Sequence, residues 1–183
     1  MKIKQALSRL ARTLLVTKTP WEFVTCDGGE LTVGTPIARV AVAGTMGAFW
    51  VREDSGAPIR LIYGGAGGAV GLSLIPFPGN FSFSIPAMPS VGTIYRLPRA
   101  GKGLSLNELK GTFLMMELSA DWGPGVSGAL MFLGGAPQLA VLAGPFFVPA
   151  LIATSKACVR FGGITATVLP VNAGATVYVG AIY

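Results

Sequence analysis

Few side chains in this sequence could perform acid–base or nucleophilic chemistry. The chain has eight aspartates and glutamates, two cysteines and no histidine. Without histidine there is no Ser-His-Asp triad, no Cys-His pair and no histidine zinc site, and two cysteines cannot complete a structural zinc site. Glu117 interrupts an apolar segment, although a solvent-facing position or an ion pair with Lys110 explains it more simply. We therefore predict that the protein is not an enzyme and holds no metal and no cofactor.

The two cysteines are Cys26 and Cys158. They could form one disulfide, but the sequence does not establish that they pair. We interpret both as small buried residues, since a cysteine that is not reactive behaves as a small hydrophobic side chain.

A glycine-rich stretch, YGGAGGAVG, occupies residues 63–71. It lacks the lysine of a phosphate-binding P-loop, because the next basic residue is Arg96, and Val70 stands where a dinucleotide fingerprint needs its third glycine. GxxxG spacing occurs twice; it allows close approach of membrane helices, whereas in a strand such glycines mark bulges or close backbone contacts. We favour the strand, with a flexible loop as the alternative. The predicted close-packing glycines are Gly64, Gly67, Gly68 and Gly71.

The composition indicates large apolar contacts outside the chain. Hydrophobic residues make up 51% and charged residues 12%, and the mean hydropathy is +0.62. Three segments, residues 61–95, 122–155 and 161–183, carry no charge and together make up about half of the chain. A soluble surface normally mixes both signs of charge throughout. We therefore expect these segments to contact lipid or other copies of the chain.

The net charge of +6 favours an acidic partner, either anionic lipid or nucleic acid. Nucleic acid is the weaker choice, because no zinc-finger, RNA-recognition or helix-turn-helix pattern is present and the basic residues are not interleaved with aromatic ones. Anionic membrane lipid is thus the predicted partner, together with further copies of this chain.

The first twenty residues predict a basic amphipathic helix. The apolar residues Ile3, Leu7, Leu10 and Leu14 follow helical spacing, and the basic residues of the segment are Lys2, Lys4, Arg9, Arg12 and Lys18. Such a helix can lie in a membrane interface, but the pattern also suits an organelle-targeting presequence or a terminal helix packed on the domain. No conventional signal peptide is recognisable. We expect a membrane-associated protein, or one released without such a signal.

Residues 21–183 predict a single Gly/Pro-rich β domain. Short β-compatible segments are separated by glycine and proline, which is typical of a sandwich or barrel of antiparallel strands. These segments are residues 39–43, 48–52, 59–63, 81–85, 165–169 and 176–179, with a hairpin connection at 54–57 and a helical turn within 102–110. The fold class is therefore mainly β, with the N-terminal helix as an appendage.

The uncharged run at residues 122–155 is long enough to span a bilayer but is interrupted by Pro137, Pro145 and Pro149. A simple spanning helix is thus not expected, while a broken helical hairpin or short strands facing lipid or a partner stay open. Phe146 and Phe147 form an apolar knob that could insert into lipid or a subunit pocket.

These patterns favour a membrane-active or membrane-associated protein, such as a pore-forming or lipid-binding toxin effector that self-assembles. The alternative is a structural assembly subunit, a shell, fibre or virion component, whose Gly/Ala-rich faces pack against copies of itself. A third option is a small barrel that binds an apolar ligand internally.

Overall fold

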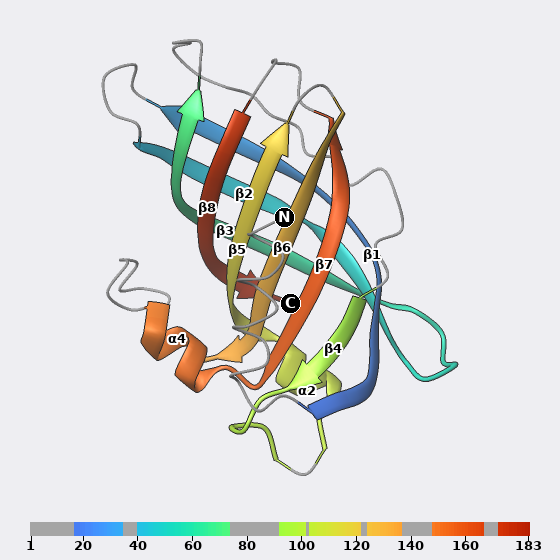
Figure 1. Ribbon diagram of the computed structural model, residues 1–183. Coiled ribbons are helices and arrows are strands. Elements are labelled where there is room, and N and C mark those ends of the chain that lie inside the picture. Colours follow the sequence, from blue (N-terminus) through green and yellow to red (C-terminus); the bar gives the residue numbers. More distant parts are fainter. Residues whose placement is uncertain are drawn as a thin grey trace.

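Eight antiparallel strands form a closed barrel (Figure 1). The computed structural model describes residues 17–34, 40–73, 92–101, 103–121, 124–136, 148–166 and 172–183. The strands are β1 (Thr17–Gly34), β2 (Val40–Glu53), β3 (Ile59–Ser73), β4 (Gly92–Arg96), β5 (Gly111–Asp121), β6 (Pro124–Gly135), β7 (Ala157–Ala166) and β8 (Asn172–Ile182). Their order around the barrel is β1-β2-β3-β8-β5-β6-β7-β4. The mainly β prediction is confirmed, and the barrel is the architecture observed.

The structure does not support the predicted N-terminal helix. β1 begins at Thr17, so the last four residues of the expected helix belong to a strand. Thr17 and Lys18 pair with β4, and the Thr19 hydroxyl donates a hydrogen bond of 2.6 Å to the Ile94 carbonyl. These long-range contacts outweigh the local helical spacing, because tertiary context overrides weak intrinsic propensity. Residues 1–16 lie outside the described residues.

The strands are longer than the sequence segments that predicted them. The segments 39–43 and 48–52 were expected to be separated by a turn, but residues 40–53 form the single strand β2. The glycines between them continue the ladder, because Gly44 and Gly47 pair in register with residues of β3. A side chain at Gly47 would meet the Asp27 carbonyl and the Tyr63 hydroxyl, so glycine fits this close contact. The predicted hairpin connection at 54–57 is confirmed, and it joins β2 to β3.

The remaining segments are partly confirmed. Residues 176–179 lie in β8, and the helical turn expected within 102–110 is α2 (Leu106–Leu109). Only residues 165 and 166 of the segment 165–169 lie in a described strand, β7. The alternating segment 81–85 lies outside the described residues.

Aromatic rings form the centre of the barrel core. Phe23 stacks on Phe49 with centroids 5.7 Å apart, Phe49 lies 6.0 Å from Tyr63, and Tyr63 meets Phe113 edge-on at 5.9 Å. These rings come from β1, β2, β3 and β5, so one chain of contacts crosses the interior. Such pairs add about 0.5–1.5 kcal/mol each beyond the burial of their surface.

The segment between β4 and β5 closes one end of the barrel. Leu104 and Leu109 are buried in the same core cluster as the aromatic rings. The Trp21 indole nitrogen donates a hydrogen bond of 2.6 Å to the Leu104 carbonyl. Glu108 of α2 accepts a hydrogen bond from the Ser105 backbone and lies 3.6 Å from the Lys156 ammonium. This end of the barrel is therefore held by apolar, hydrogen-bonded and ionic contacts together.

The uncharged run at 122–155 is not a single element. It contains β6 at residues 124–135 and the helix α4 (Val148–Thr154), and residues 122–123 and 137–147 lie outside the described residues. Among the residues that the structure describes, no helix has the length and apolar character needed to cross a membrane.

Candidate functional site

The outer wall of the barrel is the unusual feature of this molecule. Successive residues of a barrel strand point alternately to the interior and to the exterior. On β6, Met131 and Leu133 belong to the inner core, whereas Leu130 and Phe132 belong to a second apolar cluster that also contains the Leu151 side chain of α4. A strand with one solvent-exposed face would alternate between apolar and polar residues. β6 is apolar on both faces, and its outer residues Leu130 and Phe132 are buried in the second cluster, so the chain itself covers this part of the outer face.

A row of uncharged residues continues this outer surface across six strands. Each member pairs directly with the next, and we call the row the outer belt. It consists of Gly44 on β2, Ala66 on β3, Val179 on β8, Leu114 on β5, Phe132 on β6 and Cys158 on β7. The neighbouring row adds Val177, Met116 and Leu130. The apolar surface is therefore continuous around much of the wall.

The helix α4 covers one part of the outer belt. Its Leu151 is 2% exposed and lies in one cluster with Leu114, Phe132 and Cys158, while Val148 and Ile152 pack against the same cluster. Burying a leucine fully contributes about 1.5–3 kcal/mol. The hydrogen bonds at the end of α4 are mostly internal, such as that from the Ser155 hydroxyl to the Leu151 carbonyl. Apolar contact is thus the main attachment of α4 to the barrel. Figure 1 shows α4 at the end of the barrel where β5 begins and β6 ends.

Cys158 lies at the centre of this covered surface. Its side chain is 3% exposed, and burial raises the pKa of its thiol to about 12. Burial has this effect because the charged thiolate loses its hydration in apolar surroundings. The thiol is therefore neutral at physiological pH and acts there as an apolar side chain rather than as a nucleophile.

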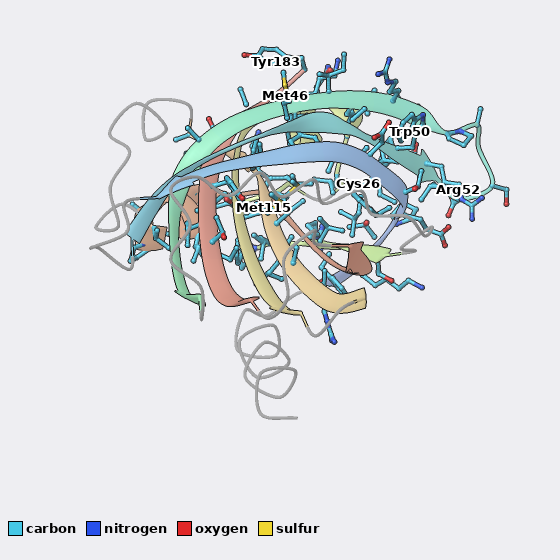
Figure 2. The ribbon with its side chains drawn as sticks, turned by 90° about the horizontal axis from the view of Figure 1, so that it is seen from above. Cys26, Met46, Trp50, Arg52, Met115 and Tyr183 are labelled. Carbon is cyan, nitrogen blue, oxygen red and sulfur yellow. The ribbon has the colours of Figure 1, made fainter. Side chains whose placement is uncertain are left out.

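A second part of the wall carries large apolar side chains that are exposed. We define the open face as Met46, Trp50, Arg60, Ile62 and Tyr183. Met46, Ile62 and Tyr183 are 71%, 51% and 73% exposed. Backbone hydrogen bonds in both directions join Tyr183 to Ile62, so the C-terminal residue extends the edge of β8 along β3. Figure 2 shows Met46, Trp50 and Tyr183 pointing away from the barrel.

Cations flank the open face. Trp50 and Arg60 pair across β2 and β3, and the Arg60 guanidinium lies 5.8 Å from the Trp50 ring centroid. An arginine over a tryptophan face gains a cation–π attraction and leaves its charge available at the surface. The neighbouring Arg52 is paired with Glu22 at 2.8 Å. The open face therefore combines apolar side chains, an amphipathic ring and a cation.

The structure describes only some of the site residues that the sequence predicted. Those of the N-terminal segment lie outside the described residues, and so do those of the apolar knob; they are Lys2, Ile3, Lys4, Leu7, Arg9, Leu10, Arg12, Leu14, Phe146 and Phe147. Sequence reasoning did not select Met46, Ile62, Arg60 or Tyr183. The alternation of residues 59–63 could have identified two of them. Leu61 and Tyr63 point into the core, so Arg60 and Ile62 must lie on the outer face.

The four selected glycines all lie on β3, between β2 and β8. A side chain at Gly67 would meet the Val177 carbonyl, whereas one at Gly64 would meet no atom within 4 Å. Gly68 and Gly71 pair in register with Val177 and Gly174. Gly65, which was not selected, lies where a side chain would meet the Phe113 ring.

The described residues contain no group of three or more His, Cys, Asp and Glu side chains that could hold a metal ion. Glu117 pairs in register with Ala129 on β6 and with Thr176 on β8. The cysteines are not joined to each other. Cys26 packs against the inner core, with its sulfur 3.8 Å from the Tyr63 hydroxyl, whereas Cys158 belongs to the outer cluster.

Taken with its fold, the apolar wall defines a closed antiparallel barrel with apolar side chains on its outer surface, part of which α4 covers. The chain is similar to a protein from Pseudomonas aeruginosa named Toxin protein Tse4. The two are 28% identical over 146 residues, which cover 73% of this chain and 72% of that protein. No family model matches the chain, and no solved structure matches it. The similarity agrees with the expectation of a toxin effector.

The similarity also corrects one prediction. The lack of histidine led us to expect that the protein is not an enzyme, but its relative is named as a toxin. Toxins include enzymes, and catalysis can rest on carboxylates, serine, lysine or tyrosine without histidine. The prediction was wrong because it took the lack of one residue type as an exclusion of all catalysis.

Proposed function

We propose that this protein is a released toxin effector that acts at a membrane, where it binds anionic lipid, self-assembles and forms pores. The open face is the observation that carries the proposal. Monomeric soluble proteins rarely expose contiguous apolar patches larger than roughly a few hundred Å², and larger patches mark sites of contact with proteins, ligands or membranes. The exposed Met46, Ile62 and Tyr183 lie beside Trp50 and Arg60, and amphipathic rings and arginines are favoured where hydrocarbon meets water.

The charge of the chain supports lipid as the partner. The net charge is +6, and the residues before Glu22 include five cations and no acid. Each lysine or arginine near an anionic surface contributes on the order of 1 kcal/mol to binding. The N-terminal segment would thus add electrostatic attraction to the apolar contact of the open face.

The similarity to a toxin supports the biological role. Toxin protein Tse4 is matched over nearly three quarters of its length, so the shared region includes most of both chains. A toxin that leaves its producer and meets a target cell encounters a membrane first. Uncharged segments over about half of the sequence then supply surface for lipid or for neighbouring copies.

The substitution Ile62→Asp tests the open face. We expect it to lower binding to vesicles of phosphatidylcholine and phosphatidylglycerol by roughly tenfold or more, because one apolar contact is lost and an anion is placed against an anionic surface. Flotation measures binding, and release of a trapped dye measures leakage. The thermal midpoint should hardly change, since Ile62 is 51% exposed.

Asn107→Asp serves as the matched control, because it adds the same charge at an exposed position on α2, outside the open face. It should retain most of the binding of the unchanged protein. If the unchanged protein neither floats with anionic vesicles nor releases dye, the membrane proposal is wrong. A defined oligomer that forms in buffer without detergent and ignores vesicles would instead favour a structural assembly subunit.

A further inference from the structure

We propose that the outer belt is a second lipid-contacting surface, which α4 covers in water and uncovers at the membrane. This inference rests on the proposed membrane function and adds to it a specific surface and its cover. The open face would make the first contact, and the belt would follow once α4 leaves the barrel.

The extent of the belt is the first support. Six directly paired positions on six strands carry no charge, and α4 packs over only some of them. Val179 of the belt and Val177 and Met116 of the neighbouring row are only partly buried. The apolar surface is therefore wider than the seven-residue helix that covers it. A cover that served only to complete a soluble core would match the surface beneath it.

The composition of the cover is the second support. α4 has the sequence VPALIAT, which contains no charged residue. Its attachment depends on Leu151, Val148 and Ile152. Hydrocarbon can replace such apolar contacts without leaving an ion or an unpaired ion-pair partner behind, whereas a helix held by salt bridges would leave buried charges. The helix itself would also be compatible with the lipid interface.

The shape of the belt favours lipid over a second copy. A closed barrel presents a convex wall, and the belt follows this wall from β2 to β7. A second rigid, convex molecule would touch one side of the wall only, whereas fluid hydrocarbon can contact every strand of the belt. An outward-facing apolar band of this kind is what lipid contact requires of a strand surface.

A reversible tether gives the decisive test. In a Cys26→Ser background, Leu151→Cys adds a thiol on α4 within the buried cluster that contains the native Cys158. Oxidation should lock α4 onto the barrel. We expect the oxidised variant to bind phosphatidylglycerol-containing vesicles normally but to release dye at least about tenfold more slowly. Adding dithiothreitol should restore release.

Two controls accompany the tether. Ala153→Cys in the same background adds a thiol on the exposed side of α4, so oxidation should leave its dye release unchanged. Leu151→Ala, which weakens the cover without any tether, should accelerate release at equal bound protein. Leu61→Ala removes an equally buried leucine from the inner core; it should lower stability without accelerating release.

The outcomes separate this inference from the proposed function. Vesicle binding and dye release that are unaffected by the tether would overturn the cover and leave the membrane proposal standing. Equal acceleration by Leu151→Ala and Leu61→Ala would also overturn it, since release would then follow general instability. If the unchanged protein does not bind vesicles at all, both the membrane proposal and the proposed role of α4 are wrong. Should the tether fail to close, the comparison of the two alanine variants decides.

Discussion

Two glycines on one strand show how a single Cβ atom limits the fold at the residue scale. Gly67 faces the backbone of β8, where a side chain would meet the Val177 carbonyl, whereas Gly64 has open space beside it. The difference arises because alternate residues of β3 point to opposite sides of the barrel wall. Glycine at position 67 thus leaves room for the β8 backbone at Val177, and glycine at position 64 has no such role.

This difference makes a testable pair of variants. Gly67→Ala should lower the free energy of unfolding by about 1–3 kcal/mol, because an atom is forced against a backbone that cannot move freely. Gly64→Ala should change it by no more than about 0.5 kcal/mol. Chemical denaturation monitored by tryptophan fluorescence measures both. Equal effects of the two substitutions would show that the Val177 contact does not limit the fold.

At the scale of elements, one carboxylate of α2 adds polar contacts to the apolar ones that hold this end of the barrel. Glu108 accepts a hydrogen bond of 3.0 Å from the Ser105 backbone and faces Lys156, which directly precedes β7. The hydrogen bond from Ser105 lowers the pKa of Glu108, with a smaller contribution from the Lys156 charge. The carboxylate therefore links the helix to its own first turn and to a neighbouring strand.

The lowered pKa fixes the sign of a pH effect. Because the folded state favours the ionised carboxylate, its stabilisation is complete above the ordinary pKa of 4.5 and is lost as the pH falls through the lower folded value. Glu108→Gln should cost about 0.5–1 kcal/mol near neutral pH, and the deficit should vanish in acid. Denaturation across this pH range measures the difference. Lys156→Met, which removes only the ion pair, should cost less than Glu108→Gln.

At the scale of the whole molecule, charge and apolar surface should contribute separately to membrane binding. Salt screens attraction between an exposed cation and an anionic surface, while it leaves hydrophobic contact largely intact. Binding of the protein to phosphatidylglycerol vesicles should therefore weaken as salt rises from about 0.05 M to about 0.5 M and then level off. Flotation across a salt series measures this. Binding that falls to nothing would indicate that the apolar faces take no part.

The two faces of the wall also explain why the sequence is so poor in charge. A closed barrel needs apolar residues on its inner face only, and its outer face can be polar. Here β6 is apolar on both faces, and the outer belt adds one uncharged outer position on each of five more strands. The low charge content is thus a property of the outer wall as well as of the core.

Several features followed from the sequence alone. The sequence predicted a mainly β fold from alternating apolar residues, β-branched residues, and glycines and prolines between the segments. These patterns depend only on local geometry. The hairpin at residues 54–57 and the helical turn at α2 were predicted for the same reason. The scarcity of charge led us to expect apolar contacts with lipid or further copies of the chain, which stays a prediction, whereas the toxin relative agrees with the effector hypothesis.

Other features depended on the tertiary structure. Helical spacing before Pro20 predicted a helix where β1 begins, because pairing with β4 across the barrel is invisible to a local pattern. The turn expected at residues 44–47 is a continuous part of β2, because these residues pair in register with β1 on one side and β3 on the other. Met46, Ile62 and Tyr183 share one face because β2, β3 and β8 are neighbours in the barrel. A sequence records which residues are apolar, but closure of the barrel decides which of them face water.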